Sequence, residues 1–163
     1  MTKVYLAHSI ATRGELEDSK RVANEIRSLG YVVYAAAENA SINDKSNDPT
    51  PIEIYAADTW EIETSDVLVV NLSGGLQDGT ISEIGFVAGM NETLTGEGYD
   101  YSTPIIAYTS NARLLQPQHY EGIPSASANH LVLGMIDRWG EFVGGEDDML
   151  ELLNDMNSDR WFS

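Results

Sequence analysis

The sequence contains no cysteine among its 163 residues. A disulfide scaffold, a thiolate zinc site and a cysteine nucleophile are therefore excluded. The length suits one compact domain over residues 1–163, whose hydrophobic core is large enough to need no covalent or metal cross-link.

Basic residues are scarce as well, because 9 lysines and arginines stand against 26 acidic residues, for a formal charge of -17. Such a surface repels phosphate backbones and anionic lipids, so we expect neither a nucleic acid nor a membrane as a partner. The acidity is otherwise explained by solubility, by adaptation to high salt, or by drift in composition.

Long hydrophobic runs are also missing, since no stretch approaches the ~20 apolar residues of a membrane span. The first ten residues, MTKVYLAHSI, enter a strand pattern directly, without the basic and apolar stretches of a secretion signal. These features predict a soluble, cytoplasmic protein.

Two nucleotide-binding motifs are absent, namely GxxxxGK[ST] and a GxGxxG after the first strand. The sequence therefore contains neither motif that usually indicates nucleoside triphosphate hydrolysis or dinucleotide redox chemistry. His8, His119 and His130 are scattered without the spacing of metal ligands. We accordingly expect no metal and no organic cofactor.

What the sequence does contain is an alternation of apolar and amphipathic segments. The strand-like segments are 3–9, 31–37, 66–73 and 103–110. The helical segments are 15–29 (followed by Gly30 as a left-handed C-cap), 51–64, one from 78, 130–142 and 146–157, and the polar connections are 38–51 and 91–102. This order predicts an α/β fold with a doubly wound parallel sheet. Ligands of such sheets bind beyond the carboxyl ends of the strands, which selects the loops 8–14, 37–50, 73–80 and 110–128.

The stretch DGTISEIGFVAG, residues 78–89, opens a helix with a single glutamate, Glu83. Its place in the expected first turn predicts a depressed pKa and an ionised carboxylate ready to act as a nucleophile. First-turn acids also serve stability alone. Asp78 precedes Gly79 in the loop, which suits either a ligand or a routine turn, and the glycines at 74, 75 and 79 allow close backbone approach.

A second carboxylate, Asp58, lies inside the preceding helix among alanines and apolar residues. Aspartate is a poor residue for a helix interior, so it needs a functional reason or a solvated helix face. A carboxylate nucleophile with a second carboxyl group nearby is what glycosyl transfer requires, because one attacks the anomeric carbon and the other handles the proton of the leaving group.

The segments KVYLAHSI, AADTWEIETSDVLVV, DGTISEIGFVAG and SANHLV together resemble the nucleoside 2-deoxyribosyltransferase family over about residues 3–135. The resemblance implies a flavodoxin-like (Rossmann-like) domain that moves a 2-deoxyribosyl group between nucleobases through a covalent sugar–enzyme intermediate. It implies that Glu83 is the nucleophile, that Tyr5 holds its carboxylate, and that Asp58 contacts the base and assists its protonation.

The same resemblance implies the substrate-binding residues Asp78, Gly79 and Thr80 from the DGT signature, with Asp78 on the sugar hydroxyls. It adds Asn129, contributed by a neighbouring subunit of a homo-oligomer, and it places Asn39 at the base and Ser9 in the loop after the first strand. Simpler roles are packing of Tyr5 on a helix and capping of a helix by Asn129. The implied partners are deoxynucleosides and free nucleobases.

Two alternatives stay open. The resemblance extends to 2'-deoxynucleoside 5'-phosphate N-hydrolases, because HSIATRG keeps a Ser-Ile pair and a nearby Arg13, and Ser127 offers a hydroxyl from a partner. A solvated surface role would also explain Arg13, and the net charge opposes a dianionic substrate. A non-catalytic nucleoside or nucleotide sensor with the same cleft is the other alternative. The sequence does not explain the tail, for whose Trp161 and Phe162 docking on a partner and covering of the cleft are two hypotheses.

Overall fold

A five-stranded parallel sheet forms the centre of the structure, a computed structural model that describes residues 1–44, 46, 48–73, 77–115, 119–120, 123–124 and 128–158. The strands are β1 (Lys3–Ala7), β2 (Val32–Ala35), β3 (Val67–Asn71), β4 (Ile105–Tyr108) and β7 (Gly140–Gly144). Their order is β2-β1-β3-β4-β7, which is the flavodoxin-like order of a doubly wound fold and confirms the predicted fold class.

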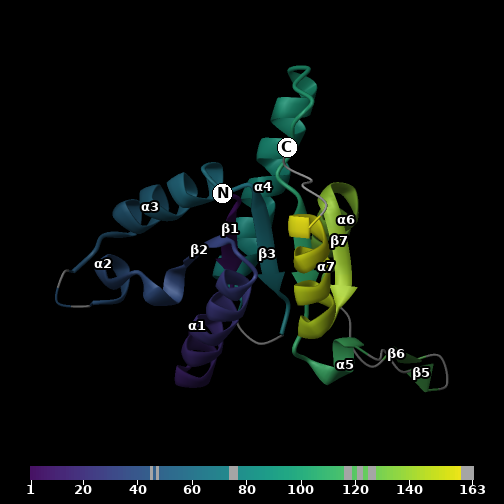
Figure 1. The fold of residues 1–163 in the computed structure, drawn as a ribbon, viewed down its shortest axis with the longest axis horizontal. Coiled ribbons are helices and arrows are strands. Elements are labelled where there is room, and N and C mark those ends of the chain that lie inside the picture. The colour runs from purple at the N-terminus through teal and green to yellow at the C-terminus, as the bar shows by residue number, and fades with distance from the viewer. Residues whose placement is uncertain are drawn as a thin grey trace.

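Helices cover both faces of this sheet (Figure 1). One face packs against α1 (Arg13–Ser28) and α7 (Glu146–Ser158), and the other against α3 (Pro51–Glu63), α4 (Asp78–Gly96) and α6 (His130–Trp139). Neighbouring side chains of one strand serve opposite faces, since Val4 and Leu6 pack towards α1 and α7 whereas Tyr5 packs towards α4 and α6. Strands β3 and β4 are buried throughout, which explains their continuous apolar runs.

The helix boundaries follow from local sequence chemistry. Helices α1 and α3 both begin with a capping box, formed by Thr12 with Glu15 and by Thr50 with Glu53, and Pro51 occupies the first turn of α3. Helix α1 ends before Gly30, whose φ of 96° confirms the predicted left-handed residue.

The connection predicted over 38–51 is partly structured. It contains the 3-10 turn η1 (Ala36–Glu38) and the single-turn helix α2 (Ala40–Asn43). The Asn39 side chain accepts a hydrogen bond from the backbone N–H of Ser41 and so caps α2. The other short elements are α5 (Ala112–Leu115), β5 (His119–Tyr120) and β6 (Ile123–Pro124).

Strand β7 contradicts the end of the helix predicted over 130–142. The observed helix α6 ends at Trp139, and β7 begins at Gly140. Gly140 pairs with Ile105 of β4, and a Cβ built on Gly140 would lie 1.8 Å from the carbonyl oxygen of Ile105. Glycine therefore lets the chain pass from helix to edge strand without a loop. The strand carries little apolar pattern because its first three residues are exposed.

Helix α4 also runs further than expected, through the first half of the connection predicted over 91–102, to Gly96. Asn91 is fully buried in its interior. Its amide donates to the carbonyl of Thr103 and accepts from the N–H of the same residue, both at 2.9 Å. This reciprocal pair satisfies a buried polar side chain and fixes α4 against the start of β4.

In the part of the chain that the structure describes, no helix has the length and apolar character to cross a membrane.

Candidate active site

Glu83 and Tyr5 form the centre of the candidate site. Tyr5 lies in the middle of β1 and is fully buried, while Glu83 faces it from α4. The Tyr5 hydroxyl donates a hydrogen bond of 2.6 Å to Glu83 Oε1. This contact joins two residues that are 78 positions apart in the sequence, and it leaves Glu83 Oε2 outside that bond.

Asp58 projects from α3 towards the same centre and is held by a second tyrosine. Tyr34 of β2 donates a hydrogen bond of 2.9 Å from its hydroxyl to Asp58 Oδ1. Tyr34 is the register partner of Tyr5 in the neighbouring strand, and their ring centroids lie 5.1 Å apart. Two adjacent strands thus each present one tyrosine to one carboxylate.

Asn39 continues this set of contacts. Its Nδ2 donates a hydrogen bond of 3.0 Å to the Tyr34 hydroxyl, and its Oδ1 accepts from both the backbone N–H and the hydroxyl of Ser41. Both the nitrogen and the oxygen of the amide that the resemblance assigns to substrate binding therefore form hydrogen bonds within the protein.

Two hollows meet at the carboxylates, with volumes of about 200 and 280 Å³. Asp58, Gly79 and Glu83 line both. The smaller hollow is otherwise bordered by Tyr55, Thr59, Ile62, Ser82 and Phe86. The larger is otherwise bordered by His8, Ser9, Ile10, Ala11, Ala36, Ile54, Gln77, Asp78 and Thr80. Each alone is smaller than the ~300 Å³ at which ligand pockets usually begin, and the three shared residues place the two hollows next to each other.

The pKa of Glu83 is raised to about 7, chiefly because burial disfavours the charged carboxylate. The hydrogen bond from Tyr5 opposes this shift, and the charge of Asp58 reinforces it. The depressed pKa predicted from the sequence is therefore wrong. Helix α4 begins at Asp78, which puts Glu83 in its second turn, beyond the free N–H groups that stabilise a carboxylate at a helix start.

The pKa of Asp58 is also raised, again mainly by burial, with the nearby charge of Glu61 acting in the same direction. The hydrogen bond from Tyr34 lowers it in part. Burial likewise raises the pKa of Tyr5 and of Tyr34 beyond the physiological range, so both hydroxyls keep their protons. The site thus holds two carboxyl groups, each paired with a neutral tyrosine donor.

The remaining predicted residues fall into two groups. Ser9, Asp78, Gly79 and Thr80 border the larger hollow, where Thr80 is 3% exposed and Asp78 is exposed. Asn129 caps the start of α6 by accepting a hydrogen bond of 2.9 Å from the N–H of Leu131, and it borders neither hollow.

Several predictions fall on residues that lie outside the described part of the chain. These are Gly74, Gly75, Ser127, Trp161 and Phe162. Within the described part, no group of three histidine, aspartate or glutamate side chains is placed to hold a metal ion.

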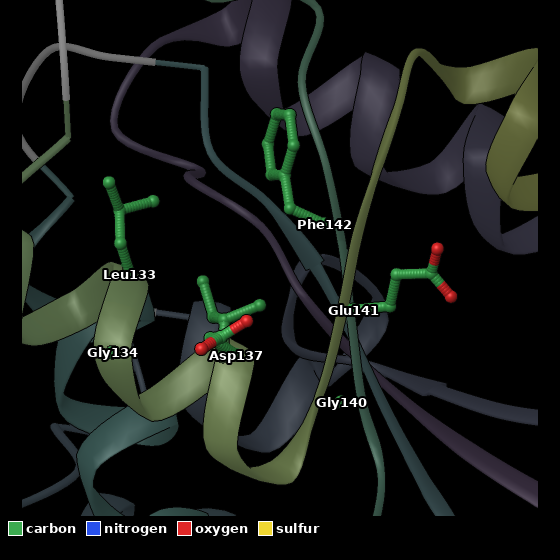
Figure 2. A pocket seen from close by; sticks show the side chains of 7 residues that line it. Leu133, Gly134, Asp137, Gly140, Glu141 and Phe142 are labelled. Carbon is green, nitrogen blue, oxygen red and sulfur yellow. The ribbon is translucent and has the colours of Figure 1, made fainter.

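Two larger hollows lie away from the carboxylates, along α6. One, of about 490 Å³, is bordered by α6 and β7, and Figure 2 shows its acids Asp137 and Glu141 with Leu133 and Phe142. The other, of about 500 Å³, lies between α4 and α6. Volume alone does not locate chemistry, and neither hollow contains a pair of carboxyl groups held by buried donors.

Tyr34 is the main site residue that sequence reasoning missed. No local motif marks it, because its place beside Tyr5 depends on how β2 aligns with β1 in the sheet. His8, which the sequence analysis considers only for metal-ligand spacing, borders the larger hollow, and its ring contacts Asp18 at 3.2 Å and Asn71 at 2.8 Å.

Comparisons with known proteins bear on the fold and the family of the chain. A comparison with curated proteins finds no match. The chain is similar to the crystal structure of a conserved protein from Enterococcus faecalis V583, at 28% identity and a TM-score of 0.75, over 95% of this chain and 98% of that one.

Two further solved structures share the fold. A 2-deoxyribosyltransferase from the psychrotolerant bacterium Bacillus psychrosaccharolyticus is 17% identical, with a TM-score of 0.53 over 69% of this chain and 76% of that one. The Clostridium botulinum CMP N-glycosidase is 15% identical, with a TM-score of 0.57 over 94% of this chain and 99% of that one. The family model described as nucleoside 2-deoxyribosyltransferase matches residues 4–149. The chain therefore belongs to the nucleoside 2-deoxyribosyltransferase family.

Proposed function

We propose that the protein transfers a 2-deoxyribosyl group from one nucleobase to another, with Glu83 as the nucleophile. The observation that carries the proposal is the 2.6 Å hydrogen bond between Tyr5 and Glu83, at a cavity that Asp58 also lines. The family membership supports the same reaction class.

In the first half of the reaction, an oxygen of ionised Glu83 bonds to the anomeric carbon as the bond from that carbon to the base nitrogen breaks. The electron pair of that bond stays on the base, which is protonated by Asp58. The products are a sugar ester of Glu83, a neutral base and an ionised Asp58. Tyr5 keeps one oxygen of Glu83 engaged, which orients the other towards the sugar.

In the second half, a nitrogen of a new base bonds to the anomeric carbon as the bond from that carbon to the Glu83 oxygen breaks. The electron pair of the broken bond restores the Glu83 carboxylate, and Asp58 takes the proton of the base. Two displacements at one carbon give net retention of configuration. Asp78, Gly79, Thr80 and Ser9 border the hollow that would hold the sugar. Neither half requires a metal or an organic cofactor.

A neighbouring subunit completes the site in this proposal. Asn129 and the exposed Leu131 stand at the start of α6, and neither borders the two hollows at the carboxylates of its own chain. A homo-oligomer that brings Asn129 to a partner's sugar site would use the asparagine both as a helix cap and as a ligand contact. Analytical ultracentrifugation of the protein reads the assembly directly.

Incubating the protein with deoxyinosine and adenine should yield deoxyadenosine and hypoxanthine, separated by liquid chromatography. Transfer requires a glycosyl-enzyme that survives until the second base arrives, so the new nucleoside should be absent when adenine is omitted. A parallel reaction with deoxyinosine 5'-phosphate tests the phosphorylated substrate.

The other outcomes of this assay assign other functions. Free deoxyribose, or its 5-phosphate, without any new nucleoside would contradict transfer and assign N-hydrolysis. Ligand-induced thermal stabilisation without any product would identify a sensor, because a sensor binds its ligand without consuming it.

The pH dependence of kcat/KM should show an acid limb near pH 7 for 7-methyl-2'-deoxyinosine, whose positively charged base leaves without a proton from Asp58. Glu83 must be ionised to attack, and its pKa in the free protein is raised to about 7. Between pH 8 and pH 5.5 we therefore expect kcat/KM for this substrate to fall by about thirtyfold. A limb near the ordinary glutamate value of about 4.3 would show that Glu83 is not the group that titrates.

A further inference from the structure

The hydrogen bonds around Tyr34 have only one possible direction. The backbone N–H of Ser41 can only donate, so the Asn39 atom that it contacts is the oxygen, and the other is the amide nitrogen. That nitrogen donates to the Tyr34 hydroxyl. The single proton of the hydroxyl is then left for Asp58 Oδ1, 2.9 Å away.

This direction constrains where a proton can sit on Asp58. Oδ1 accepts the proton of Tyr34, so a proton carried by Asp58 itself is favoured on Oδ2. Among the described residues, no other hydrogen bond to Asp58 accompanies the one from Tyr34. Asp58 lines both hollows, so Oδ2 is the oxygen left to serve a molecule bound there.

We propose that Tyr34 is a positioning residue for cleavage of the N-glycosidic bond, because it fixes Asp58 and directs its proton to Oδ2, towards the leaving base. The inference rests on the proposed function and adds to it a residue that touches no substrate atom. In the cleavage step, the proton on Oδ2 passes to the base nitrogen that receives the electron pair of the broken bond. Asp58 is left ionised, with Oδ1 still bound to Tyr34.

The surroundings of Tyr34 suit this role. Its ring is tilted by 33° against that of Tyr5, and its backbone is paired with β1 in the sheet. Its hydroxyl is fixed from the opposite side by Asn39, whose oxygen is in turn occupied by Ser41. The charged groups around Asp58, namely Glu61 on its own helix and Glu83 on α4, are both acids. A donor on Oδ1 is therefore the contact that makes Asp58 a stronger acid, since the Tyr34 hydrogen bond lowers its pKa.

The test compares two substrates that differ in their need for a proton. Deoxyinosine releases hypoxanthine, which must be protonated as it leaves. In 7-methyl-2'-deoxyinosine the base already carries a positive charge and departs as a neutral molecule. Tyr34→Phe keeps the ring and removes the hydroxyl. Release of each base is followed by chromatography, with the spontaneous loss of the methylated base subtracted.

We expect Tyr34→Phe to lower kcat for deoxyinosine by about tenfold to a hundredfold, a part of what general acid catalysis supplies. KM should be unchanged, because Tyr34 does not touch the substrate. The kcat for the methylated substrate should stay within about twofold of the original protein. Asp58→Asn should show the same selectivity between substrates. Adding Tyr34→Phe to it should cost nothing further, because the two residues act through one proton.

Tyr31→Phe is the matched control. It removes a tyrosine hydroxyl that donates at 2.7 Å to the carbonyl of Leu153, on the other face of the sheet. It should leave the ratio of the two substrates unchanged. An equal loss on both substrates in Tyr34→Phe, or no loss on either, would overturn the role of Tyr34. If the unaltered protein releases neither base, the proposed function itself fails, and this inference with it.

Discussion

Replacing Glu83 by glutamine should reduce kcat for deoxyinosine by about 10⁴-fold or more, because the proposed reaction forms the sugar ester on the Glu83 carboxylate, which glutamine lacks. The substitution keeps the size of the side chain and an oxygen that can accept the Tyr5 hydrogen bond. The loss should therefore appear in kcat, while binding of the nucleoside, read by calorimetry, should change little.

The intermediate itself can be trapped on the unaltered protein. A nucleoside with fluorine at the 2' position destabilises positive charge at the anomeric carbon and slows release of the sugar from the enzyme. Mass spectrometry of the digested protein should find the added sugar on the peptide that contains Glu83. Glu92→Gln, an exposed change on the same helix, is the control and should retain full activity. Appreciable activity in Glu83→Gln, or a label on another residue, would remove Glu83 as the nucleophile.

The sequence carries most of the fold in readable form. The buried runs of β3 and β4 and the capping residues Thr12 and Thr50 are local signals, because each depends on residues that are close together in the sequence. Strand β7 could not be predicted in the same way. Its one decisive feature is the close approach of Gly140 to Ile105, a contact between segments that are 35 positions apart.

In the candidate site, too, features of single residues can be predicted from the sequence, whereas features that depend on contacts between distant segments cannot. A single carboxylate in DGTISEIG identifies Glu83 as a residue of interest, but its pKa depends on how much protein surrounds it and on where α4 begins. Tyr34 is harder still. Its role depends on the alignment of β1 with β2 and on the place of Asn39 after η1, and neither is encoded in a motif. The chemistry of single residues was thus readable, and their coupling was not.

Glu83→Gln should also make the protein more stable at pH 8, by on the order of 3 kcal/mol, and leave its stability at pH 4 nearly unchanged. The pKa of Glu83 is about 7 in the folded protein and close to 4.5 in the unfolded chain. Below pH 4.5 the group is protonated in both states and costs nothing. As the pH rises from 4.5 to 7, the unfolded chain loses its proton first, so the folded state becomes progressively less favourable. Each pKa unit of difference corresponds to about 1.4 kcal/mol, and glutamine, which is never charged, avoids the whole cost.

Urea unfolding of both proteins at pH 4 and pH 8 measures the effect, because the remaining charges of this acidic chain contribute equally to both and cancel in the difference. Glu92→Gln should show no gain between the two pH values, since the exposed Glu92 is not forced to ionise inside protein. Equal stability changes at both pH values would mean that Glu83 is not held in a costly ionised state. A gain confined to pH 8, together with the loss of turnover, would show that the protein keeps a carboxylate that weakens its fold because the reaction needs the negative charge.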